Sequence, residues 1–167
     1  MTNQENFQSW FASNIRKMAA DRSAGFIVAM VCFPLLERYL RQLTKAEPKS
    51  PKFIAALLRL IPELESIENA KTFWIVYRHG LLHDITMSRE THGLTHDSKI
   101  VEMRTDSKVW LNPEIFSERV LTIIEKDFDI FESGSPLPTV SVYPIIEADP
   151  TSYYNGTSAT LNKDNKN

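Results

Sequence analysis

Residues 24–36 read AGFIVAMVCFPLL and form the longest apolar run in the chain. A helix that crosses a membrane needs about twenty apolar residues, and this run is shorter. Its residues are apolar on every helical face, as expected for a helix that other elements surround. The sequence therefore predicts a central buried helix over about residues 23–43, in which Pro34 causes a kink or is tolerated by its neighbours.

Helical signals continue on both sides of this run. Apolar side chains recur at helical spacing in residues 3–20, from Pro51 to an interruption near Pro62, in 70–81, and in 113–132. Ser50-Pro51 and Asn112-Pro113 each combine a capping side chain with a proline suited to the first helical position. These patterns predict an all-α domain of about five helices.

The pattern changes between residues 84 and 110, which contain Gly93 and several Ser and Thr residues. Lys99–Arg104 and Lys108–Leu111 are short β-tolerant stretches that Thr105-Asp106-Ser107 separates. They predict a small β-hairpin or an ordered loop inserted before the last helix. We expect residues 1–133 to form the helical domain and 134–167 to form a flexible tail. The stretch 139–146 is apolar enough to dock on the domain, and the sequence leaves that docking open.

Composition narrows the range of functions. The chain has 167 residues, 19 of them basic and 21 acidic, and a formal net charge of -2. This balance argues against a protein that coats nucleic acid or binds a membrane surface through bulk positive charge. A single cysteine excludes an internal disulfide framework. The N-terminus lacks the pattern of a secretory signal, so we expect a cytoplasmic protein without a membrane partner.

All four histidines fall between positions 79 and 96, and the densest group of reactive side chains is Arg78-His79-Gly80-Leu81-Leu82-His83-Asp84. The arginine fork suits phosphate oxygens, and histidine transfers protons near neutral pH. Together they can cleave RNA without a metal or cofactor, because one group moves the proton and the other stabilises charge on phosphorus.

The spacing of Arg78 and His83 suggests a shared cleft. On an ideal helix, residues five apart point roughly 140° away from each other and lie about 7.5 Å apart along the axis. The side chains of Arg78 and His83 therefore cannot face the same atom on one continuous helix. They can do so if the helix ends between them, or they can act in a cleft that a second surface completes. A symmetry-related copy of the chain is one such surface.

The tract Phe73-Trp74-Ile75-Val76-Tyr77-Arg78-His79-Gly80-Leu81-Leu82-His83 resembles the R-x(4–6)-H signature of the HEPN superfamily. The resemblance implies a helical bundle of this size that acts as a metal-independent endoribonuclease. It also implies a homodimer whose paired arginines and histidines line one cleft, where RNA makes a local contact. Toxin–antitoxin systems, which would supply an antitoxin partner, and phage defence are the settings it suggests.

The same resemblance assigns roles to individual residues. Arg78 and His83 are the implied catalytic pair, and His79 is the implied polar helper. Glu37 resembles the acidic residue that the family often carries on an early helix, and it would orient Arg78. Ile85 stands where one toxin branch has tyrosine. This departure, like the β insertion, separates the chain from that branch.

Three other interpretations remain open at this stage. Arg78 could simply pair with Glu37 or Asp84, while His83 stabilises the end of its helix. His79 and His83, four residues apart, could instead hold a metal in a site that Asp84, His92 and His96 complete, although we expect no metal site. The simpler expectation for His92 and His96 is that they belong to a solvated loop. Finally, the chain could be a non-catalytic HEPN-like module that dimerises or binds a protein, RNA or nucleotide.

Overall fold

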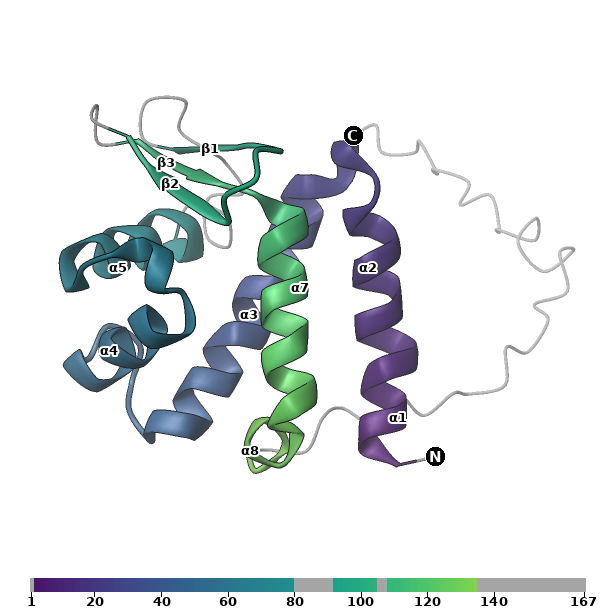
Figure 1. Ribbon diagram of the computed structural model, residues 1–167. Coiled ribbons are helices and arrows are strands. Elements are labelled where there is room, and N and C mark those ends of the chain that lie inside the picture. Colours follow the sequence, from purple (N-terminus) through teal and green to yellow (C-terminus); the bar gives the residue numbers. More distant parts are fainter. Residues whose placement is uncertain (1, 80–91, 105–107, 135–167) are drawn as a thin grey trace, which may run out of the picture. The chain divides into compact units, whose positions relative to one another are not determined.

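The computed structural model describes residues 2–79, 92–104 and 108–134 (Figure 1). An N-terminal rod consists of α1 (Asn3–Phe7), a π-helical turn η1 (Gln8–Ala12) and α2 (Ser13–Ala19). It starts at Thr2, whose side chain accepts from the Glu5 backbone N–H while the Glu5 carboxylate accepts from the Thr2 N–H. This reciprocal cap satisfies two donors at the helix start. The predicted helix over 3–20 is confirmed.

The apolar run lies within α3 (Gly25–Thr44), which follows a short 3₁₀ turn, η2 (Arg22–Ala24). The helix packs against α2 and against α4, α7 and α8, whose bounds are given below, and Val28, Cys32 and Leu36 are fully buried. It continues through Pro34, which is exposed. By length and composition, Arg22–Thr44 is the one helix in the described part of the chain that could cross a membrane, a test that core helices also pass.

The next helices follow the predicted boundaries. The Ser50 side chain caps α4 (Pro51–Leu60) by accepting from the Phe53 N–H. A 3₁₀ turn, η3 (Pro62–Leu64), interrupts the helix and leads to α5 (Ile67–Trp74), whose cap is Ser66. A π-helical segment, η4 (Ile75–His79), continues α5 without a break in the helical backbone.

A small sheet follows, and it is larger than the predicted hairpin. Strands β2 (Val101–Met103) and β3 (Val109–Leu111) pair antiparallel, as a hairpin does. A further strand, β1 (His92–Leu94), pairs parallel to β3 and gives the order β1-β3-β2. The prediction that His92 belongs to a solvated loop is therefore wrong for its backbone, whereas His96 is exposed after the strand.

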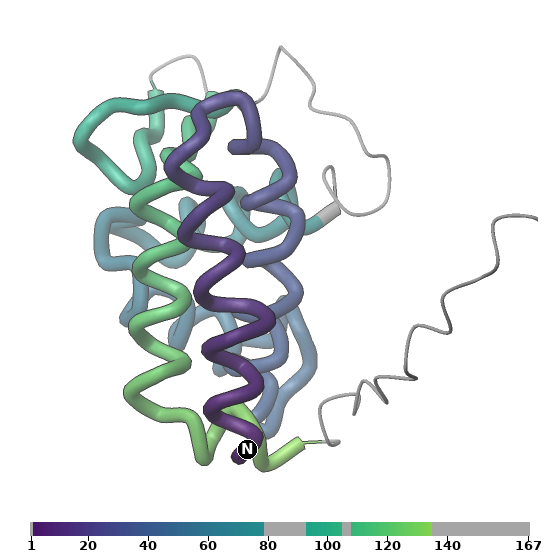
Figure 2. Tube along the Cα trace, turned by 90° about the vertical axis from the view of Figure 1, so that its right-hand side faces the viewer, coloured from purple at the N-terminus to yellow at the C-terminus, as the bar shows by residue number. Residues whose placement is uncertain are grey.

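The last predicted helix is divided in two. Asn112 caps α7 (Pro113–Lys126), and the helix breaks at Asp127 before α8 (Phe128–Glu132). Figure 2 shows the N-terminal rod beside α7, with α3 packed against both. The described part of the chain is mainly helical with one small sheet. The predicted tail from 134 onward, including the stretch 139–146, lies outside the described residues except for Gly134.

Candidate functional site

The candidate site centres on an ion pair between Arg78 of η4 and Glu37 of α3. Arg78 Nε lies 2.8 Å from Glu37 Oε2 and donates a hydrogen bond to it. The side chain of Arg78 is 25% exposed and that of Glu37 is 13% exposed. Because Glu37 approaches from a separate helix, the pair limits the directions in which the guanidinium can point while part of it stays accessible.

Aromatic packing places Arg78 opposite Glu37. Tyr77, the residue before Arg78, stacks on Phe33, the residue four positions before Glu37, with ring centroids 5.7 Å apart and planes 8° apart. Phe33 also contacts Phe73 and Phe116, at 5.5 and 4.8 Å between centroids. The stacked rings and the ion pair therefore connect the same two helical segments. Phe73, Trp74 and Tyr77 are all fully buried and therefore belong to the core.

The Tyr77 hydroxyl fixes η4 to the sheet. It lies 2.7 Å from the carbonyl oxygen of Gly93 in β1 and 2.8 Å from that of Val109 in β3. Burial raises the pKa of Tyr77, so its hydroxyl keeps its proton as a donor. The backbone that carries Arg78 is thus held from the helical side by Phe33 and from the sheet side by two carbonyl oxygens.

Of the remaining predicted site residues, the structure describes only the backbone of His79, which is the last residue of η4. His83 and Asp84 lie outside the described residues. The structure therefore brings Arg78 and Glu37 together, and the pairing of Arg78 with His83 stays a prediction.

Exposed apolar residues flank the ion pair. Ile75 lies three residues before Arg78 and is 49% exposed. Pro34 lies three residues before Glu37 on α3 and is also exposed. The two segments that carry the ion pair, η4 and α3, therefore each also expose an apolar side chain.

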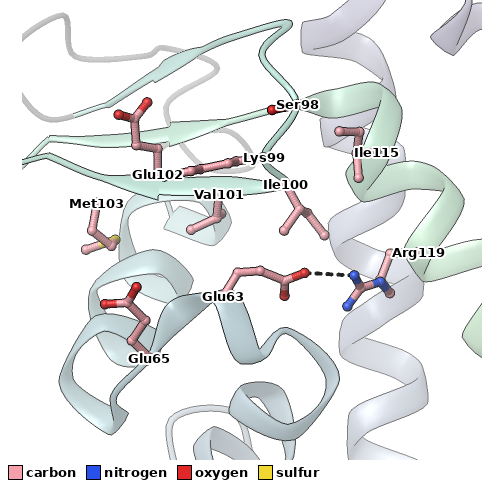
Figure 3. Close-up of a pocket in the computed structure, with 10 residues that line it drawn as sticks. All are labelled: Glu63, Glu65, Ser98, Lys99, Ile100, Val101, Glu102, Met103, Ile115 and Arg119. Carbon is pink, nitrogen blue, oxygen red and sulfur yellow. Dashed lines mark hydrogen bonds and ion pairs between the residues drawn. The ribbon is translucent and has the colours of Figure 1, made fainter.

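A separate cavity of about 480 Å³ opens between β2, η3 and α7 (Figure 3). Glu63 Oε1 accepts from Arg119 Nη2 at 2.8 Å, and Arg119 Nη1 donates to the Leu60 carbonyl oxygen at 3.0 Å. Glu63 Oε2 is buried and has no hydrogen-bond partner among the described residues. Neither Arg78 nor Glu37 lines this cavity. The sequence offered no signal for it, because its walls come from three elements far apart in the chain.

Other reactive side chains have structural surroundings. Cys32 is fully buried, and desolvation raises the pKa of its thiol to about 12, which disfavours the reactive thiolate. Within residues 2–79, 92–104 and 108–134, no group of three or more His, Cys, Asp or Glu side chains could hold a metal ion. That finding does not extend to His83 and Asp84, which the alternative metal interpretation requires.

Comparisons with protein-family models, with curated proteins and with solved structures found no significant match to this chain.

Proposed function

We propose that the chain is a HEPN-like, metal-independent endoribonuclease that works as a homodimer. Arg78 would stabilise the charge that develops on the scissile phosphate, and His83 would transfer the proton. In this reaction the ribose 2′-oxygen loses its proton and attacks phosphorus. The bond from phosphorus to the 5′-oxygen breaks, and the departing oxygen takes up a proton.

The observation that carries the proposal is the 2.8 Å contact between Arg78 and Glu37 at a partly exposed place. An arginine held by a carboxylate from another helix is preorganised, which is how electrostatic stabilisation of a transition state is obtained. Tyr77 and Phe33 add to this by fixing the backbone before Arg78 and the helix that carries Glu37. The Arg78 side chain as a whole is 25% exposed, so it is not sealed in the core.

The exposed apolar side chains beside the pair favour a homodimer as the working form. Ile75 and Pro34 would be covered if two copies met through this face, which would bring two Arg78 side chains toward one cleft. Replacing Ile75 by aspartate should shift the protein from dimer to monomer in analytical ultracentrifugation. The matched variant Ile67→Asp alters an isoleucine of similar exposure on α5 and should leave the dimer intact.

Cleavage of RNA in the presence of EDTA tests the proposed activity. The wild type should cut RNA, and Arg78→Ala and His83→Ala should each lower the rate at least about a hundredfold. Arg22→Ala and His96→Ala alter an exposed arginine and an exposed histidine elsewhere and should retain the wild-type rate. Equal rates in all four variants would refute the assignment.

The alternative is a non-catalytic HEPN-like dimerisation or binding module, in which Glu37 and Arg78 only join two helices. The 13% exposure of the Glu37 side chain favours such a structural contribution as well. This alternative predicts a stable dimer that cuts no RNA, together with a protein, RNA or nucleotide partner. The EDTA assay separates the two functions directly.

A further inference from the structure

A concave surface of about 510 Å³ lies where the end of α3 meets α4. Seven residues line this groove, which we call the α3–α4 groove: Leu43, Thr44, Pro51, Lys52, Ala55, Ala56 and Arg59. The four lining residues from Lys52 to Arg59 recur at helical spacing and thus share one face of α4. Their small alanines form an apolar floor, and Lys52 and Arg59 stand one at each end of it.

The groove lies within a basic stretch of a chain that is slightly acidic overall, and Lys52 and Arg59 are its two basic lining residues. Residues 41–60 contain five basic side chains and one acidic side chain, whereas the whole chain has a net charge of -2. Arg16, Arg78 and Arg119 each form an ion pair with a glutamate. In contrast, no carboxylate from the described residues forms an ion pair with Lys52 or Arg59. Their positive charge is available to an external anion.

The groove lies on the same side of α3 as the proposed active site. Glu37, Arg41 and Thr44 are separated by four and three residues, so they lie along one face of the helix. Seven residues of helix correspond to about 10 Å along the axis. A polyanion held at Arg78 can therefore extend past Arg41 to the α3–α4 groove.

We propose that the α3–α4 groove binds the phosphate backbone of the RNA strand that Arg78 and His83 cleave. The inference rests on the proposed function, because the nuclease substrate supplies the continuous polyanion. Among the residues that the structure describes, no aromatic side chain lines the groove, so they offer no platform on which a base could stack. Lys52 and Arg59 therefore hold phosphates and position the strand without reading its sequence.

Fluorescence anisotropy with a labelled, unstructured oligo(U) RNA in EDTA tests this binding surface. All proteins carry Arg78→Ala so that the RNA stays intact. The double variant Lys52→Glu/Arg59→Glu should bind about tenfold more weakly, and its affinity should depend less on salt, with a log–log slope smaller by about 1.4 for two lost phosphate contacts. The matched control is Lys17→Glu/Lys126→Glu, which reverses two exposed lysines on α2 and α7 and should bind like the parent.

Each outcome decides the proposal. Equal RNA affinity in the two double variants overturns it, even when wild-type protein cleaves RNA and the proposed function stands. Binding of poly-glutamate in place of RNA identifies an acidic-peptide site and also overturns it. Selective loss of RNA binding in Lys52→Glu/Arg59→Glu supports the groove even if no cleavage is found, in which case only the nuclease assignment fails. Circular dichroism melting of each variant confirms that these surface changes leave the fold intact.

Discussion

The Tyr77 hydroxyl lies 2.7 Å from the carbonyl oxygen of Gly93, and this hydrogen bond connects the end of a helix to the first strand of the sheet. Tyr77 directly precedes Arg78, so the same contact limits the position of the arginine. Both Tyr77 and Gly93 are buried, which makes the hydrogen bond inaccessible to competing water. The sheet thereby stabilises the segment that carries the candidate site.

Replacing Tyr77 by phenylalanine should lower the free energy of unfolding by about 1–2 kcal/mol, because buried carbonyl oxygens lose their donor. Urea unfolding measures this change. Tyr39→Phe is a suitable comparison, since the Tyr39 hydroxyl donates to Asp127 Oδ2 at 2.9 Å at the junction of α7 and α8. Both variants should lose stability, but only Tyr77→Phe should slow RNA cleavage. An unchanged unfolding curve for Tyr77→Phe would contradict the contact.

The ion pair between Arg78 and Glu37 should show strong energetic coupling in a double-mutant cycle. The Glu37 side chain is only 13% exposed, so Arg78→Ala leaves a nearly buried carboxylate without this partner. We expect a coupling energy of about 1–2 kcal/mol, with Arg78→Ala less stable than Arg78→Ala/Glu37→Ala.

The pair Arg41–Glu47 provides the matched control for that cycle. Its side chains are 46% and 78% exposed, and its nitrogen and oxygen lie 3.1 Å apart. Solvent screening should reduce its coupling to below about 0.5 kcal/mol. Coupling energies of equal size in the two cycles would show that burial of Glu37 has no effect on the pair.

Local signals in the sequence account for much of the fold. Ser50-Pro51 and Asn112-Pro113 do begin helices, because a capping side chain and a proline act within one turn. The pairing of Arg78 with Glu37 was also among the expected contacts. The break at Asp127 was missed, because the apolar stripe continues through it to Phe131 and gives no sign of a change in helix axis.

The strand pairing of β1 was not predicted from the sequence. Strand β1 is three residues long, and it pairs parallel to β3, which lies beyond β2 in the chain. A short strand of this kind is stabilised by its partner and by Tyr77 rather than by its own residue preferences. The α3–α4 groove has the same origin, since it depends on how two helices meet around the loop between them.

Gly93 should be required for packing of the sheet. A Cβ atom at this position would lie 2.8 Å from Trp110 Cζ3 and 2.9 Å from Cε3, and a ring in a packed sheet has little room to move. Gly93→Ala should therefore lower stability by about 1–3 kcal/mol in thermal unfolding. Gly134→Ala is the control, because its Cβ would meet the flexible end of Gln42, which can rotate away. A larger loss of stability in Gly134→Ala than in Gly93→Ala would contradict the steric clash expected at Gly93.

Arg16 should make stability depend on pH in the acidic range. Its Nε lies 2.8 Å from Glu118 Oε2 and its Nη1 lies 2.8 Å from Glu125 Oε1, so it joins α2 to α7 through two carboxylates. The hydrogen bond from Arg16 lowers the pKa of Glu118 in the folded protein. A lowered folded-state pKa stabilises the fold above the unfolded pKa of about 4.3, and this stabilisation disappears as the pH falls through the folded-state value.

Replacing Arg16 by methionine should therefore cost about 1 kcal/mol near neutral pH, where the Glu118 carboxylate is charged. Well below the ordinary glutamate pKa the two proteins should differ less in stability, because the protonated Glu118 carboxyl group no longer attracts the guanidinium. Urea unfolding at the two pH values measures the difference. Lys17→Met, which removes an exposed neighbouring charge on α2, should show no such loss at neutral pH. A stability gap for Arg16→Met that persists in acid would mean that Arg16 acts through packing of its aliphatic chain rather than through its charge.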